Sequence, residues 1–239
     1  MTPKRALFVM ALLWCVPAHA QEEEACLPAA QCNLESGFSV SVYGMSGLFI
    51  PPGLSMHPAP GDALPTPLEG VDFTLEGAGP YLGTGARFFF QGRIARAGVG
   101  GGVYQLDHGL AVARGVPSGE VRLDKLYAWG GHIEAFGGGE LDLRPLYPYA
   151  DLAMWVDIVQ TRYRLATSAQ GALGTTALNA YSFGIGPRVG VIVPVSSNMF
   201  LDLAATGGVI GANRLSITAG LGFQTAPRPP FEGCASHCR

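Results

Sequence analysis

The sequence predicts an all-β protein, an eight-stranded antiparallel up-and-down β-barrel that spans a membrane. Only 14% of the 239 residues are charged, against about 25% in ordinary soluble domains. The chain has 34 glycines and 18 prolines, and no apolar run approaches the roughly 20 residues of a membrane-spanning helix. Apolar and small polar residues instead alternate with period two, which is typical of strands with one apolar face.

The N-terminus has the pattern of a secretory signal peptide. Lys4 and Arg5 precede an apolar run over 6–16, and Ala18-His19-Ala20 follows it, as expected for export and cleavage. We therefore expect a signal peptide over 1–20, a periplasmic leader over 21–36, the barrel over 37–224 and a Pro- and Cys-containing periplasmic tail over 225–239.

Four cysteines flank the predicted barrel. Cys26 and Cys32 precede it, and Cys234 and Cys238 follow it. An even number in an exported chain favours disulfides, either local or joining the two ends. Zinc binding by these cysteines with His237 is the alternative that the residue types allow.

Eight segments carry the strand pattern. We predict strands over 37–50, 81–90, 93–106, 124–136, 146–163, 177–193, 198–210 and 215–223. Long connections over 51–77, 107–122 and 164–176 alternate with short turns. Since outer-membrane barrels have short periplasmic turns and long external loops, the alternation places both termini in the periplasm and all three long loops outside.

The last predicted strand has the clearest alternation. Leu215, Ile217, Leu221 and Phe223 are separated by Ser216, Thr218 and glycines. We expect this strand to close the barrel by pairing with 37–50.

With these residues in view, the chain resembles the small eight-stranded outer-membrane barrels of the OmpA and OmpX type over 37–224. Members of that family end their last strand with alternating apolar residues and an aromatic, which the outer-membrane insertion machinery recognises. The resemblance implies that Leu215, Ile217, Leu221 and Phe223 form an insertion signal. It also implies a location in the outer membrane of a Gram-negative bacterium, with membrane lipid and the insertion machinery as partners.

The charged residues of the strands fall on the face opposite the apolar one, and the alternation puts Asp124 there together with Glu134. A charge that faces hydrocarbon at the bilayer midplane costs about 2 to 4 kcal/mol, and the interior of an eight-stranded barrel is narrow enough for side chains to fill it. We therefore expect a charge network that plugs the lumen, formed by Arg87, Arg96, Glu134, Asp151, Asp157, Arg188 and Asp202.

The sequence contains only weak indications of catalytic or ligand-binding residues. His132 with Glu134, or Asp151 with Asp157, could act as acid and base, but structural pairing explains them better. The glycine run over 98–102 has no helix after it to bind a phosphate. We expect no catalytic residue, no cofactor and no metal, and the net charge of −3 gives no footprint for nucleic acid.

The leading hypothesis is a structural or surface-binding barrel whose external loops carry the function, with an unknown extracellular partner. One alternative is a soluble periplasmic binder of lipocalin type, in which the apolar faces point inward. A second is a lipid-modifying enzyme at the outer rim, where His57 and His108 lie in predicted loops. A narrow pore is the third.

Overall fold

The computed structural model describes residues 37–225, except 52, 63, 65–70, 93, 107–109, 115–120, 144, 168–170 and 212. The predicted signal peptide, the leader, the tail beyond Thr225 and the four flanking cysteines lie outside the described residues. The described part contains no helix that is long and apolar enough to cross a membrane.

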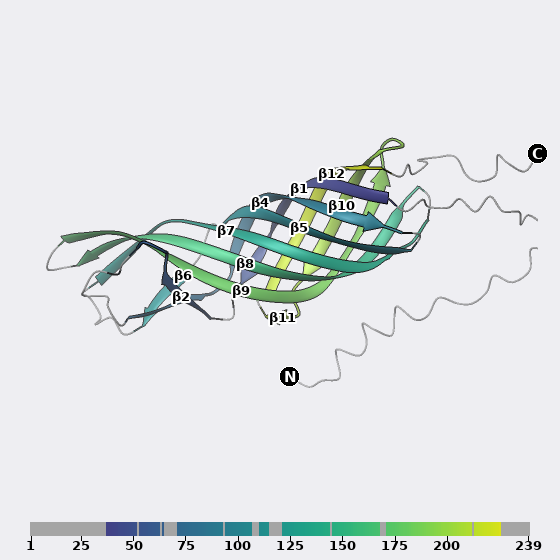
Figure 1. Cartoon of the computed structure of the whole chain (residues 1–239). Coiled ribbons are helices and arrows are strands. Elements are labelled where there is room, and N and C mark those ends of the chain that lie inside the picture. The colour runs from purple at the N-terminus through teal and green to yellow at the C-terminus, as the bar shows by residue number, and fades with distance from the viewer. Residues whose placement is uncertain are drawn as a thin grey trace, which may run out of the picture. The chain divides into compact units, whose positions relative to one another are not determined.

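Eight long antiparallel strands form a ring in the described part of the chain (Figure 1). Each pairs with its neighbour in chain order, and β10 pairs with both β9 and β12, so the ring has no free edge along most of its length. The strands are β1 (Gly37–Ile50), β4 (Gly79–Gln91), β5 (Ala95–Leu106), β7 (Val121–Glu140), β8 (Tyr147–Thr167), β9 (Gly171–Pro194), β10 (Met199–Gly207) and β12 (Asn213–Gln224).

The first and last strands close the barrel, as the sequence predicts. They pair antiparallel from Ser39 opposite Gln224 to Ile50 opposite Asn213. We call the end of the barrel at Gly37 the proximal end. The end at Ile50 is the distal end.

A sheet extends the barrel beyond its distal end, where β8 and β9 run past the other strands and meet short strands (Figure 1). β2 pairs with β9, and β3 pairs with both β2 and β6. A two-residue strand, β11, also pairs with β9. We call β2, β3, β6 and the distal parts of β8 and β9 the distal extension. The short strands are β2 (Leu54–Pro58), β3 (Asp72–Glu76), β6 (Leu110–Arg114) and β11 (Ile210–Gly211).

The predicted long loops are therefore wrong in part. The connection 51–77 contains β2 and β3, 107–122 contains β6 and the start of β7, and 164–176 is largely the distal ends of β8 and β9. The physical reason is that strand segments beyond the apolar outer surface of the barrel do not face lipid, so their outward residues need not be apolar. Arg164 is exposed whereas Leu165 is buried, so only the inward half of the alternation is left as a signal.

The apolar faces of the ring strands point outward, with the phase that the sequence predicts. Ile133 is 72% exposed, Leu82 70% and Ile217 67%. One assignment is wrong: the sequence places Asp124 on the inner face with Glu134. A β-bulge between Lys125 and Tyr127 shifts the register, so Asp124 lies opposite the exposed Arg164. A bulge adds one residue to one strand and so reverses the alternation beyond it.

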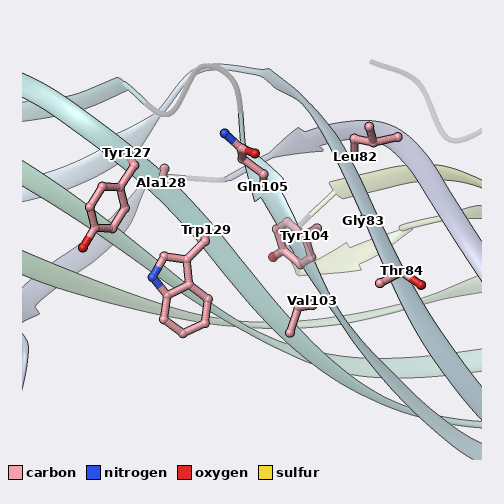
Figure 2. Close-up of a pocket in the computed structure, with 9 residues that line it drawn as sticks. All are labelled: Leu82, Gly83, Thr84, Val103, Tyr104, Gln105, Tyr127, Ala128 and Trp129. Carbon is pink, nitrogen blue, oxygen red and sulfur yellow. The ribbon is translucent and has the colours of Figure 1, made fainter.

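The outer wall has a groove of about 690 Å³ between β4, β5 and β7. Figure 2 shows Leu82 and Thr84 on one side of it, Tyr127 and Trp129 on the other, and Val103 between them.

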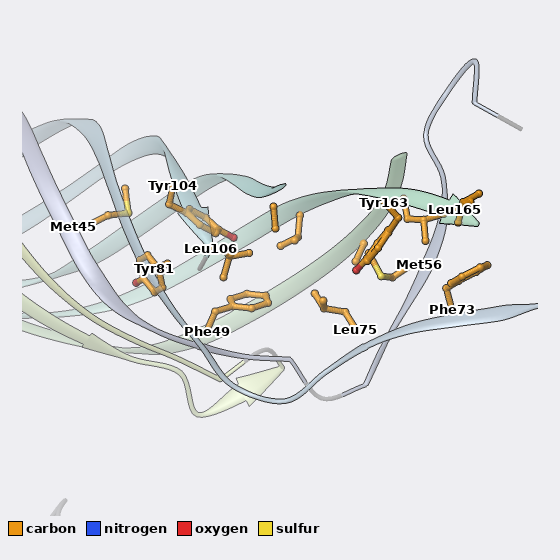
Figure 3. Close-up of a cluster of buried hydrophobic side chains, with 14 of the residues drawn as sticks. Met45, Phe49, Met56, Phe73, Leu75, Tyr81, Tyr104, Leu106, Tyr163 and Leu165 are labelled. Carbon is orange, nitrogen blue, oxygen red and sulfur yellow. The ribbon is translucent and has the colours of Figure 1, made fainter. Parts of the chain in front are cut away.

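Two clusters of buried apolar side chains fill the interior. The first reaches from Tyr43 and Met45 in the barrel to Met56, Phe73 and Leu165 in the distal extension (Figure 3). One apolar core therefore joins the distal part of the barrel to the distal extension. The second cluster lies within the barrel and includes Phe89, Phe136, Tyr147, Tyr149, Trp155, Ile192 and Phe200.

Candidate functional site

The candidate site is the polar interior of the barrel, where Glu134 on β7 holds two arginines. Its Oε1 accepts a hydrogen bond from Arg87 Nε at 2.6 Å and one from Arg188 Nη1 at 3.3 Å. Arg87 Nη1 also lies 3.7 Å from Asp202 Oδ2. Each of the four side chains is at most 4% exposed, so β4, β7, β9 and β10 are tied together in the interior.

Asp151 on β8 continues this network toward the proximal end. Its Oδ2 lies 4.0 Å from Arg188 Nε, and its Oδ1 lies 3.4 Å from Arg96 Nε. Arg96 Nη1 in turn lies 3.7 Å from Glu140 Oε2. Acidic and basic groups thus alternate from Asp202 to Glu140, which lets each buried charge face an opposite one.

Aromatic rings provide the remaining contacts of the arginines. The guanidinium of Arg96 lies 3.6 Å from the ring centre of Tyr149 and 4.7 Å from that of Phe89. Arg188 lies 4.2 Å from the ring centre of Phe136. Such cation–π contacts are strongest when water is excluded, so the second apolar cluster helps to hold the charges.

A separate polar group lies nearer the distal end. Arg214 on β12 donates to Asp157 Oδ1 from Nη1 at 3.3 Å and to Tyr81 Oη from Nε at 3.0 Å. Tyr104 Oη donates to the same carboxylate oxygen of Asp157 at 3.0 Å. This group joins β4, β5, β8 and β12.

His132 lies between the two groups. Its Nε2 is 3.2 Å from Tyr43 Oη, and the Arg87 guanidinium lies 4.0 Å from the centre of the Tyr43 ring. His132 is 4% exposed. It is thus packed inside the barrel, as are Glu134 and the two aspartates that the catalytic alternative names.

All seven charged residues singled out in the sequence lie inside the barrel, and six of them belong to one network. The seventh, Asp157, pairs with Arg214, which sequence reasoning missed. It also missed Glu140. Both residues carry an available signal: Arg214 extends the inward series of Ser216 and Thr218 by one step, and Glu140 continues the series of Glu134 beyond three glycines.

The residues proposed as an insertion signal lie on the outside of β12. Leu215, Ile217, Leu221 and Phe223 are all between 43% and 67% exposed. His57 is exposed on β2, and His108 lies outside the described residues. Among the residues that the structure describes, no three His, Cys, Asp or Glu side chains are grouped to hold a metal ion.

The chain is similar to some solved structures. No family model and no curated protein sequence matches the chain. Among solved structures, Neisserial surface protein A (NspA) is 15% identical with a TM-score of 0.45, covering 79% of this chain and 96% of that one. Ail, the attachment invasion locus protein of Yersinia pestis, solved with the heparin analogue sucrose octasulfate, is 10% identical with a TM-score of 0.32, covering 79% and 98%. In the described residues the chain is all-β, with an antiparallel ring of eight long strands, as the sequence predicts.

Proposed function

We propose that the protein is a small integral barrel of the Gram-negative outer membrane, with an interior plugged by its own side chains and a distal extension that serves as a structural or binding surface. The observation that carries this is the inverted burial of the strands. Ile133 is 72% exposed while Arg188, on the inner face, is 0% exposed. Large apolar surfaces of this kind are stable in lipid, whereas in water they drive association.

The interior supports a closed barrel. Arg87, Arg96 and Arg188 are among the largest fully buried side chains, and they are held by carboxylates on facing strands. Moving an arginine out of this network would leave a buried carboxylate without its partner, at a cost of about 3 to 5 kcal/mol. The network is therefore a plug that belongs to the folded state, and a narrow open pore is disfavoured.

The distal extension supports a surface role. Its strands share an apolar core with the barrel, including Met56, Phe73 and Leu75, each at most 4% exposed. A packed sheet presents its outer residues in fixed positions, which suits recognition better than loose loops do. With the proximal end in the periplasm, as the connection lengths indicate, this surface faces outside the cell.

The lipocalin alternative requires an outer surface that suits water. The outer surface here instead carries Ile133, Leu82 and Ile217, while the arginines lie in the interior with aromatic rings. The rim-enzyme alternative has less support than a surface role, because His57 is exposed without a neighbouring catalytic group among the hydrogen bonds of the described residues.

Membrane fractionation combined with gel mobility tests the proposal. The full chain, expressed with its own N-terminus, should sediment with outer membranes, resist extraction by urea, and migrate differently before and after boiling. Extraction by urea with no heat-dependent change in mobility would contradict an integral barrel.

A further inference from the structure

Thr84 and Val103 line the groove on the outer wall, and Gly131 on β7 lies beside Val103 at the same height. Thr84 on β4, Val103 on β5 and Gly131 on β7 are direct partners in the register. A Cβ atom at Gly131 would meet nothing closer than 3.7 Å, so the space beside Val103 is open. The outer face of β7 thus carries no side chain at the position next to Val103, and the groove is open on that side.

The distal end of the groove is bounded by aromatic rings in fixed positions. Trp129 Nε1 donates to Gln160 Oε1 at 3.0 Å, and Gln160 Nε2 donates to Asn179 Oδ1 at 3.0 Å. These three residues are direct partners across β7, β8 and β9. Figure 2 shows the rings of Trp129 and Tyr127 side by side at the groove. Rings with one apolar and one polar end are typical of the boundary between membrane and water.

The outward residues of β8 change character at this row. On the proximal side, Val156 and Ile158 are exposed. On the distal side, Arg162 and Arg164 occupy the same outer face. The row therefore marks the level at which hydrocarbon gives way to lipid headgroups. The groove crosses this level, with Thr84 and Val103 on the hydrocarbon side and Tyr127 on the headgroup side.

Arg162 supplies a cation next to the groove. Its Nη1 donates to Tyr127 Oη at 3.2 Å, whereas its Nε is buried and has no hydrogen-bond partner among the described residues. Acidic groups balance part of the local positive charge. Asp124 lies opposite Arg164, and Asp62 interacts electrostatically with Arg162. Nη2 is neither buried without a partner nor engaged in the Tyr127 hydrogen bond, so it is the donor left for an anionic group outside the protein.

We propose that this groove binds one acyl chain of a phosphate-bearing lipid of the outer leaflet, whose headgroup is held by Arg162. The chain lies over Val103 and Gly131 and against Trp129, and the phosphate accepts from the guanidinium. The inference rests on the proposed membrane location, and it adds a defined lipid site to a surface that otherwise contacts bulk lipid.

The test uses Trp129 as the reporter, in the full chain with Trp14 and Trp155 replaced by phenylalanine. The protein is reconstituted into bilayers that contain phosphatidylglycerol or phosphatidylcholine with brominated acyl chains, which quench tryptophan on contact. One basic residue near a membrane surface favours an anionic lipid about fivefold. Half-maximal quenching should therefore need about fivefold less brominated phosphatidylglycerol than phosphatidylcholine.

Two variants separate the headgroup from the acyl chain. Arg162→Gln should abolish the preference for phosphatidylglycerol and leave quenching by phosphatidylcholine unchanged. Gly131→Phe, which fills the open side of the groove, should lower quenching by both lipids. Ala205→Phe, also outward but on β10, is the control and should change neither. Equal quenching by the two lipids, or an unchanged preference in Arg162→Gln, would overturn the inference. Failure to insert, seen as a missing heat-dependent mobility shift, would instead overturn the proposed function.

Discussion

The side chains of Arg87 and Glu134 form the shortest ion pair described inside the barrel, at 2.6 Å, although their strands are not neighbours. The strand between them is β5, and its residue in the same row is Gly100. The pair meets over the bare backbone of this glycine. Arg96 and Asp151 repeat the arrangement over Gly138 of β7. Glycines therefore set which charges can pair.

Gly100→Val should destabilise the barrel. A Cβ atom there would lie 2.9 Å from Arg87 Cγ and 3.0 Å from Glu134 Oε1, so the ion pair must move or break. Overpacking of this kind costs about 1 to 3 kcal/mol. Denaturant unfolding of the detergent-solubilised protein measures the loss. Gly131→Val, on the outer face of β7 where a Cβ atom would meet nothing closer than 3.7 Å, is the matched control, and an equal loss in both variants would refute the steric reason.

Glu134→Gln should cost more, about 3 to 5 kcal/mol, because it leaves Arg87 and Arg188 buried with a weaker partner. Replacing the pair together, as Arg87→Met with Glu134→Leu, should recover part of the loss because it removes one of the uncompensated charges. The free energies of unfolding of Arg87→Met, Glu134→Leu and the double variant give the coupling. Strict additivity would show that the pair contributes nothing as a pair.

Arg188→Ala should increase ion flow through the barrel. The guanidinium is 0% exposed and contacts both Glu134 and Asp151, so its removal leaves space and unbalanced negative charge in the interior. Single-channel recording in planar bilayers measures this, with cations favoured over anions. A large conductance in the unmodified protein would show that the interior is not plugged.

Phe223→Ala should reduce the amount of assembled protein in the outer membrane more than it reduces the stability of protein that is already folded. Phe223 is 51% exposed on the closing strand, so little packing is lost. Phe88→Ala on β4, at 60% exposed, controls for the loss of an outward aromatic. Heat-modifiable protein in membrane fractions is the readout. Equal assembly of the two variants would remove Phe223 from the insertion signal.

Leu178→Ala should loosen the distal extension and leave the ring intact. Leu178 is 0% exposed and lies opposite Pro58 of β2. Its truncation leaves a cavity, which lowers the stability of the extension by about 2 to 5 kcal/mol. Hydrogen exchange in 54–58 and 72–76 should become faster, while β1 and β12 stay protected. Leu201→Ala, outward on β10, should change neither. Unchanged exchange in β2 and β3 would show that this core does not hold the extension.

Much of the barrel followed from the alternation of residues alone. Since neighbouring side chains of a strand point to opposite faces, the spacing of Leu215, Ile217 and Phe223 already determined which side faces outward, and the same rule put Arg87 and Arg188 inside. The pairing of the last strand with the first follows from ring closure.

Only the tertiary structure decided which charges meet and what lies beyond the distal end. Pairing over Gly100 depends on the register of three strands, and a shift of one residue would turn every side chain to the other face. The bulge between Lys125 and Tyr127 turns Asp124 to the outer face. No glycine, proline or other turn residue lies between Lys125 and Tyr127 in the sequence to indicate this bulge. The sequence did not predict the distal extension, because its strands lie beyond the part of the barrel with an apolar outer face. There only the buried residues, such as Leu165 and Leu178, have to be apolar, so the alternation is incomplete.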